Sequence, residues 1–402
     1  MKKKTLVRAL TVFILLVAFR AATTCIAPLI NNLLVEQGHS FEAQAMISGA
    51  VLAVGYIATI VGSMVGGSVA DRMGPKKTIL IAGSLFAAGF LVFSFANAGP
   101  MLYINRVVLA LCTGALYVAL QSYILGGVKK GSEGMAMGIY GLSFGIGTAL
   151  AGTASGMADT VGIRNVFLTM GIVCAGAVVL GTVATRIDSR LPIPEGVEPA
   201  MKKQTASPSP LKVLRRSSVS FLLLMVNALF YGFGLIIFLQ YVDELGAARG
   251  LEGTKASFGI AVFSILSLFQ PVTGLIADRI GKGTCALLGQ GLIALGWIPL
   301  ALLPQLSLGP VLALSAVAGL GAALYSPATL AIAELSAPEG SGGTVRGIYQ
   351  GANSLGSAIA AVFGSVIYMR IGIGNVFLLL VAACALGLVS VVLLTAALRK
   401  KK

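Results

Sequence analysis

Long apolar runs recur from one end of this 402-residue chain to the other, and they restrict its fold more than any other feature. About 20 consecutive apolar residues are enough for a helix to cross a bilayer. Only 11% of the residues are charged, against roughly 25% in a soluble protein. We count twelve runs, with predicted bounds 8–34, 43–70, 77–97, 101–126, 134–157, 163–186, 217–242, 254–277, 284–304, 309–334, 343–368 and 372–397. The sequence therefore predicts an all-α integral membrane protein with twelve transmembrane helices.

The two halves of the chain repeat each other. GSVADRMGPKK at 67–77 returns as GLIADRIGKG at 274–283, which places Asp71 and Asp278 207 positions apart. Three further pairs follow in the same order: GALY at 114–117 with AALY at 322–325, GIYG at 138–141 with GIYQ at 347–350, and GIRNVFL at 162–168 with GIGNVFL at 372–378. Parallel repeats of this kind are common in membrane transporters. We therefore expect one six-helix bundle over 1–186 and a second, pseudo-symmetric one over 217–402. The proline-rich stretch 187–216 is the predicted cytoplasmic linker.

The basic residues are sorted by membrane side. With the N-terminus in the cytoplasm, 23 of the 29 Lys and Arg residues fall in inside segments and only four in outside segments. This bias follows the positive-inside rule and predicts a multi-pass protein of the cytoplasmic (inner) membrane with both termini cytoplasmic. The net charge of +15 is spread over these loops. We therefore expect the lipid bilayer, and no nucleic acid, as the partner of this charge.

The loop between the second and third predicted spans resembles that of the major facilitator superfamily. The resemblance extends over essentially the whole chain, and the positions that match its loop motif are Gly67, Asp71, Arg72, Gly74, Lys76 and Lys77, with a fainter copy at Gly274, Asp278, Arg279, Gly281 and Lys282. The resemblance implies that Asp71 meets the start of span 11 near Gly342 and Gly343. Asp71 and Arg72 would then close the cytoplasmic side in the outward-open state. The alternative is that the basic residues only set the topology.

Elementary physics supports a special role for this loop. Asp71 ends a helix, where the dipole of its own helix disfavours an anion, so another helix N-terminus or an arginine must compensate its charge. Gly67 permits a close helix contact, and Gly74 permits a turn with positive φ. Together with these contacts, the resemblance implies gating or coupling roles for Gly67, Asp71, Arg72, Gly74 and Lys76, and for Asp278 and Arg279 in the second copy.

Arg20 is the sharpest indication of function, because it lies near the middle of the first predicted span. A charge at that depth costs at least about 2.5–3.5 kcal/mol on insertion scales, and such residues usually face a polar cavity. Helical spacing places Arg20, Thr24 and Asn31 on one face. None of the fourteen acidic residues lies in the middle of a span, so a bound anion is the expected partner of Arg20. The alternative is an arginine held by the protein for structural reasons.

Arg106 is the second intramembrane cation, in the fourth span. Its surroundings, NRVVLALCTG, resemble the family motif R-x-x-Q-G but carry Leu109 and Ala110 in place of Gln and Gly. The resemblance implies a role in proton coupling, and a packing role is the alternative. The fifth span lacks the Gly-Pro pair of the family's antiporter motif, so that motif does not indicate antiport here.

Further polar or aromatic residues near span centres are candidate substrate contacts. They are Tyr117, Gln121, Asn227, Tyr231, Tyr325, Gln350 and Asn353. For each of them, hydrogen bonding between helices is an equal alternative.

These observations predict a secondary active transporter, and not an enzyme, that works by alternating access on a small organic or inorganic anion. Protons are a candidate coupling ion. The alternative is a drug:proton antiporter that exports amphipathic compounds, and a remoter one is a receptor or a subunit that transports nothing. No Walker motif is present, and the single histidine and scattered cysteines form no metal motif. We expect no cofactor, no metal and a monomer.

Overall fold

The computed structural model describes residues 3–95, 99–129, 131–156, 158–192, 209–251, 255–336 and 341–399, and no strand is present among them. In chain order the helices are α1 (Lys3–Glu36), α2 (Phe41–Met73), α3 (Pro75–Phe93), α4 (Pro100–Leu125), α5 (Glu133–Gly156), α6 (Ala158–Val161), α7 (Ile163–Arg190), α8 (Pro210–Arg216), α9 (Val219–Ala248), α10 (Ser257–Ser267), α11 (Gln270–Ile280), α12 (Lys282–Leu302), α13 (Leu308–Leu335), α14 (Gly342–Ile371) and α15 (Ile373–Arg399). The predicted all-α fold is confirmed.

Within the described residues, eleven helices are long and apolar enough to cross a membrane, and a twelfth candidate is the bent pair α10 and α11. We predicted one continuous span over 254–277, whereas the two helices meet at an angle of 52°. Pro271 lies in the first turn of α11. Proline has no N–H to donate and fits the first turn of a helix, so its position agrees with a break between α10 and α11.

The chain divides into two compact units. Unit 1 consists of Met1–Lys130, Ser143–Val213 and Pro338–Gly351, and unit 2 consists of Gly131–Leu142, Leu214–Ala337 and Ala352–Lys402. Helices α5 and α14 therefore each contribute to both units. Residues 193–208 of the predicted linker lie outside the described part of the chain.

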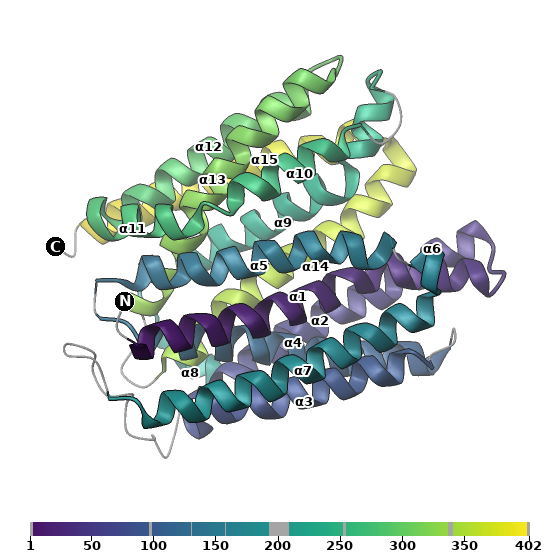
Figure 1. Cartoon of the computed structure of the whole chain (residues 1–402). Helices are drawn as coiled ribbons and strands as arrows, with labels where there is room; N and C mark the ends of the chain where they lie inside the picture. Colours follow the sequence, from purple (N-terminus) through teal and green to yellow (C-terminus); the bar gives the residue numbers. More distant parts are fainter. Residues whose placement is uncertain are drawn as a thin grey trace. The chain divides into compact units, whose positions relative to one another are not determined.

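Unit 1 packs around aromatic rings and close helix contacts. Helix α7 lies beside both α1 and α3 (Figure 1). Phe19 of α1 meets Phe86 of α3 at a ring distance of 5.2 Å, and Phe93 of α3 meets Phe167 of α7 at 4.8 Å. Between α2 and α4, a Cβ atom on Gly62 would lie 2.3 Å from the backbone oxygen of Leu111. Small residues thus allow α2 and α4 to approach closely, as in other membrane bundles.

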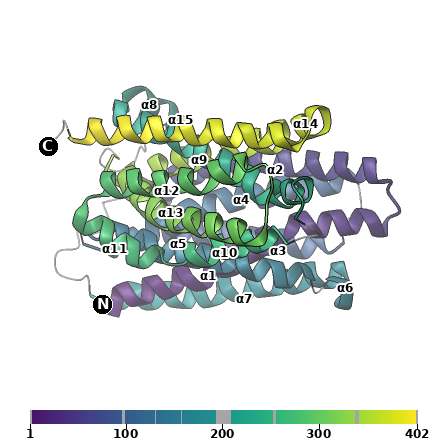
Figure 2. The ribbon, with the colours of Figure 1, turned by 90° about the horizontal axis from the view of Figure 1, so that it is seen from above.

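Unit 2 is built in the same way. Helices α12 and α13 lie side by side, and α15 packs against α9 and α12 (Figure 2). Trp297 of α12 is buried and stacks on Phe238 of α9 and Phe263 of α10 at ring distances of 5.5 Å and 5.9 Å. A Cβ atom on Gly296 would lie 2.4 Å from the backbone oxygen of Leu314, which shows how closely α12 and α13 approach.

Large apolar side chains are exposed on both units. Ile172, Leu295 and Phe363 are each between 57% and 59% exposed. In water, extended apolar patches of this kind would promote association. In the hydrocarbon core of a membrane, apolar side chains can be exposed without the free-energy cost of contact with water. Their exposure therefore agrees with a chain that spans a membrane.

The repeat seen in the sequence is also present in the backbone. Gly74, between α2 and α3, has φ of 87°, and Gly281, between α11 and α12, has φ of 105°. Residues other than glycine rarely adopt this conformation. The prediction of positive φ at Gly74 is confirmed.

Candidate functional site

Arg20 points from α1 toward α5 within unit 1. Its Nε donates a hydrogen bond of 2.8 Å to Thr148 Oγ1, and its Cζ lies 3.9 Å from the centre of the Phe144 ring. Nη1 lies 3.5 Å from the hydroxyl oxygen of Tyr117 on α4. Gly147 makes this arrangement possible, because a Cβ atom there would lie 2.7 Å from Arg20 Cβ. Arg20 is therefore held by a hydroxyl, a ring face and a phenol.

None of these contacts neutralises the positive charge of Arg20. In the described part of unit 1, Asp188 forms ion pairs with Arg8 and Lys76, and no ion pair is found for Arg20. A cation over an aromatic face gains about 0.5–2 kcal/mol, which offsets only part of the cost of placing a charge in a membrane. Within the described residues, the surroundings of Arg20 thus combine a hydroxyl, a phenol and an aromatic face with one cation and no acidic group.

Arg106 of α4 belongs to the same neighbourhood. It is 6% exposed, and its Nε and Nη1 have no hydrogen-bond partner among the described residues. Tyr56 of α2 interacts electrostatically with Arg106 and also with Arg20. Tyr117, which contacts Arg20, also interacts electrostatically with Arg106. Tyr56 and Tyr117 thus both lie in the electrostatic surroundings of the two guanidinium groups.

Other candidate residues of unit 1 lie on the same helices. The Oγ1 of Thr24 on α1 and both amide atoms of Gln121 on α4 are buried and have no partner among the described residues. Gln350 is partly buried on the segment of α14 that belongs to unit 1. The side chain of Asn31 lies outside the described part of the structure. The structure thus brings together Arg20, Arg106 and Tyr117 from the candidate set.

The candidates of unit 2 form a separate cluster. Tyr325 of α13 donates a hydrogen bond of 2.5 Å to Asn227 Oδ1, and its ring lies 4.5 Å from that of Tyr231. Asn227 Nδ2 donates to Gly387 O at 2.8 Å and to Ser390 Oγ at 3.0 Å. Both amide atoms of the fully buried Asn227 are therefore engaged within the protein.

Asn353 of α14 contacts α9, the helix that carries Asn227. Its Nδ2 donates to the backbone oxygen of Ala228 at 3.3 Å. A Cβ atom on Gly232 would lie 2.2 Å from Asn353 O, so α9 and α14 are in close contact there. Asn227 and Asn353 therefore both link helices within unit 2, which is the alternative that sequence reasoning left open for them.

The first copy of the loop motif places Asp71 at the N-terminus of α14. Its carboxylate accepts hydrogen bonds from Gly343 N at 2.7 Å, Thr344 N at 2.8 Å and Thr344 Oγ1 at 2.8 Å. These backbone N–H groups belong to the first turn of α14 and have no partner within their own helix. A Cβ atom on Gly67 would lie 2.2 Å from Gly343 O, so only glycine admits this contact. The expected contact of Asp71 is present, and Arg72 is exposed beside it.

The second copy repeats this geometry in unit 2. Asp278 of α11 accepts hydrogen bonds from Gly134 N at 2.9 Å and Met135 N at 3.0 Å, both in the first turn of α5. A Cβ atom on Gly274 would lie 2.1 Å from Gly134 O. Lys282 lies 3.4 Å from Asp278 and donates to Glu133 at 3.0 Å. Arg279, like Arg72, is exposed.

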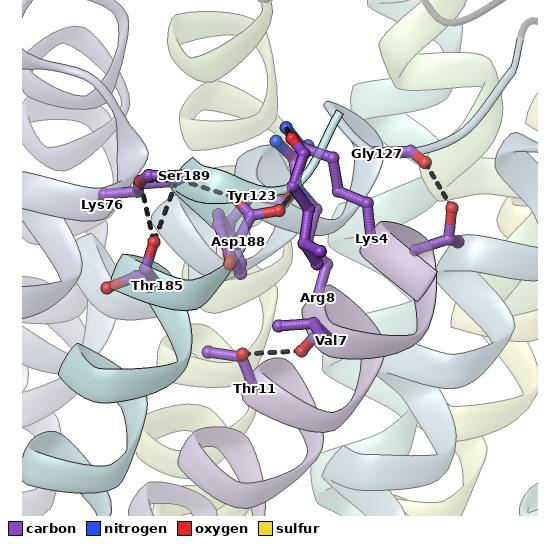
Figure 3. A network of polar contacts seen from close by, with 12 residues as sticks. Lys4, Val7, Arg8, Thr11, Lys76, Tyr123, Gly127, Thr185, Asp188 and Ser189 are labelled. Atoms are coloured by element: carbon purple, nitrogen blue, oxygen red, sulfur yellow. Dashed lines mark hydrogen bonds and ion pairs between the residues drawn. The ribbon is translucent and has the colours of Figure 1, made fainter. Parts of the chain in front are cut away.

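Lys76 takes part in a network that sequence reasoning missed. Asp188, in the last turn of α7, is completely buried and forms ion pairs with Arg8 of α1 at 2.9 Å and with Lys76 of α3 at 2.6 Å (Figure 3). Lys4 donates to Leu191 O at 2.7 Å, and the guanidinium of Arg8 lies 5.2 Å from the ring centre of Tyr123. We placed Asp188 in the linker, but α7 continues to Arg190 and carries its carboxylate inward.

Sequence reasoning also missed Tyr56, Phe144 and Thr148 as neighbours of the two arginines. Phe144 and Thr148 are spaced i, i+4 on α5, so they share one face of that helix. This spacing could have predicted a shared polar and aromatic face, but it lies within a glycine-rich stretch that indicates only close helix packing. Among the described residues, no group of His, Cys, Asp and Glu could hold a metal ion.

Comparison with curated proteins finds relatives that match part of this chain. The curated relatives include the Multidrug resistance protein MdtG of Klebsiella pneumoniae (strain 342), 27% identical over 192 residues, which are 47% of this chain and 45% of that protein. MdtG of Escherichia coli O17:K52:H18 (strain UMN026 / ExPEC) is 31% identical over 182 residues, or 44% of each chain. The Uncharacterized MFS-type transporter YfiU of Bacillus subtilis (strain 168) is 33% identical over 84 residues, 21% of this chain and 16% of that protein. The chain thus spans less than half the length of these relatives.

Two solved structures share the fold over almost the whole chain. The human organic anion transporter MFSD10 (TETRAN) has a TM-score of 0.77 at 16% identity, covering 97% of this chain and 99% of that one. The proton:xylose symporter XylE has a TM-score of 0.76 at 15% identity, covering 96% and 94%. At such identities the likeness shows the fold alone.

The family assignment rests on the match along the sequence. The family model of the Major Facilitator Superfamily matches residues 12–306 and 244–402, so nearly the whole chain is covered. The membrane-spanning helices agree with a multi-pass membrane protein. The chain belongs to the Major Facilitator Superfamily.

Proposed function

We propose that this protein is a secondary active transporter of the cytoplasmic (inner) membrane that carries a small organic or inorganic anion by alternating access. The observation that carries the proposal is the environment of Arg20. Its guanidinium meets Thr148, Tyr117 and the face of Phe144, and none of these groups is charged. A buried cation without a counter-ion is costly, and a carboxylate or phosphate bound to the guanidinium would relieve that cost.

The described carboxylates of unit 1 are used elsewhere or lie away from the site. Asp71 binds the N-terminus of α14, and Asp188 binds Arg8 and Lys76. Glu36 is exposed at the end of α1. A cationic substrate would need an acidic partner near Arg20, and none of these residues supplies one. This distribution of charge favours an anionic substrate.

The gating part of the proposal concerns the two motif copies. Asp71 and Asp278 each bind the first turn of another helix, and Gly67 and Gly274 allow those contacts. In the proposed cycle these contacts form and break as access alternates, with the basic loops on the cytoplasmic side. Protons are the proposed coupling ion, and the transporter is proposed to act as a monomer.

A thermal-stability screen tests the choice of an anionic substrate. Purified protein in detergent is heated with phosphate, sulfate, butyrate, succinate or lactate. Each anion is present at about 100 times its expected Kd, a concentration at which a bound ligand stabilises a protein by about 2.7 kcal/mol. We expect at least one anion to raise the Tm of the wild type and of Arg370→Gln, a control that removes an exposed charge. Arg20→Gln should show no such rise. An equal rise in Arg20→Gln would contradict the proposal.

A second candidate is export of drug-like amphipathic compounds. The observation in its favour is the similarity to two MdtG proteins, whose names describe multidrug resistance. The two candidates differ in their dependence on Arg20. If expression in a drug-sensitive bacterium confers resistance, and Arg20→Gln confers as much, the export function is favoured over anion transport.

A further inference from the structure

We propose that Arg106 gives the Arg20 site a second positive charge, so that its ligand is a small organic dianion with two acidic groups, such as a dicarboxylate. This inference rests on the proposed anion transport and specifies the substrate class. It starts from the burial of Arg106, whose Nε and Nη1 have no hydrogen-bond partner among the described residues. A buried charged donor without a partner is destabilising, so a group absent from the chain itself is the expected acceptor.

The protein backbone makes a specific place for this guanidinium. A Cβ atom on Gly55 of α2 would lie 2.3 Å from Arg106 Nε, 2.6 Å from Nη2 and 2.7 Å from Cζ. The guanidinium therefore lies directly against the backbone of α2, where any larger residue would displace it. Glycine at position 55 leaves the space that the guanidinium of Arg106 occupies.

Two tyrosines join the two arginines into one site. Tyr56 interacts electrostatically with both guanidinium groups, and Tyr117 contacts Arg20 at 3.5 Å and interacts electrostatically with Arg106. Both arginines are therefore close to the same pair of phenol rings. A ligand with two acidic groups offers one group to each guanidinium.

Charge complementarity then decides between a monoanion and a dianion. Two like charges in a medium of low polarity repel each other. A monoanion on Arg20 would leave Arg106 uncompensated, whereas a dianion neutralises both. Because a hydrogen bond to a charged group contributes about 1.5–3 kcal/mol, the second acidic group should tighten binding by roughly tenfold or more.

The test compares matched ligands on the full-length protein. Isothermal titration at pH 7.5 measures the Kd of malonate, succinate, glutarate and adipate and of their monomethyl esters, which keep the carbon chain but carry one charge. We expect the wild type to bind at least one dicarboxylate at least tenfold more tightly than its monoester. Arg106→Gln should bring that ratio to about one, because it weakens binding of the dicarboxylate more than binding of the monoester. Arg106→Lys should keep part of the preference.

Gly55→Ala provides a second variant that leaves the chemistry of Arg106 unchanged. The new Cβ should displace the guanidinium, which is the flexible end of a long side chain, and lower the preference for the dicarboxylate without unfolding the helix. Gly176→Ala is the matched control, because a Cβ atom on Gly176 would meet no atom within 4 Å. It should keep the ratio of the wild type.

The outcomes separate this inference from the proposed function. If the wild type binds a monoester as tightly as its dicarboxylate, or if Arg106→Gln keeps the preference, the second-charge role of Arg106 is wrong and anion transport still stands. If neither class binds the wild type and the wider anion screen is also negative, both proposals fail.

Discussion

The two copies of the loop motif use the same contact and surround it differently. In unit 1, Asp71 accepts two backbone N–H groups and one hydroxyl from the start of α14. In unit 2, Asp278 accepts two backbone N–H groups from the start of α5. Met135 stands in the place of Thr344 and has no hydroxyl to donate. The carboxylate at a helix N-terminus is thus the feature common to both copies, since it satisfies groups that the helix leaves without partners.

The basic residues near the two carboxylates have different partners. Lys282, one turn after Asp278, lies 3.4 Å from it and also pairs with Glu133. The corresponding position in the first copy is Pro75, and the following residue, Lys76, pairs with Asp188 on α7 instead. Both copies of the motif thus share the backbone contact, while the surrounding ion pairs differ.

The largest expected effect comes from removing the two charges. Each asparagine keeps one acceptor oxygen and places an NH2 group against a backbone N–H, so each variant loses at least one hydrogen bond to a charged acceptor, worth about 1.5–3 kcal/mol. Asp278→Asn also removes the negative charge 3.4 Å from Lys282, although Lys282 keeps Glu133 as a partner. We expect both variants to lower the Tm and the transport rate. Unchanged uptake and unchanged cytoplasmic accessibility in Asp71→Asn would contradict the gating proposal.

The next effect tests the similarity of the two copies. Gly67→Ala and Gly274→Ala each place a Cβ atom about as close to a backbone oxygen, 2.2 Å and 2.1 Å. Overpacking of this kind typically costs about 1–3 kcal/mol, because a backbone atom cannot move aside cheaply. We expect similar falls in Tm for both variants, measured by thermal unfolding. The controls Gly176→Ala and Gly291→Ala meet no atom within 4 Å and should be neutral. A fall in only one variant would show that the two contacts are not equivalent.

The smallest effect sharpens the difference between the copies. Thr344→Val removes only the hydroxyl hydrogen bond to Asp71 and should cost about 0.5–1.5 kcal/mol. The reciprocal change, Met135→Thr, offers Asp278 the third donor that its copy lacks, so it should raise the Tm slightly. A fall in Tm for Thr344→Val as large as that for Asp71→Asn would mean that the hydroxyl, and not the backbone contact, dominates this site.

The fold class and the repeat can be predicted from the residues alone, and the contact of Asp71 from the family resemblance. The backbone of a segment in a bilayer must satisfy its own hydrogen bonds, so long apolar runs can only be helices, and counting them predicts the architecture. The motif resemblance located the partner of Asp71 near Gly343, where the hydrogen bond is found. Arg20 can be identified from hydropathy alone, because it is a charged residue within an apolar run.

The side chains that contact those residues could not be predicted, because they come from other helices. Thr148 and Phe144 reach Arg20 because Gly147 lets α5 approach α1, and the spacing along one helix cannot show which helix lies opposite. Asp188 became a buried ion-pair partner because α7 extends further than hydropathy suggests. A local sequence pattern indicates which kind of partner a residue requires, such as a hydrogen-bond donor, a counter-ion or a small side chain on the adjacent helix. Only the packing of distant segments decides which residue supplies it.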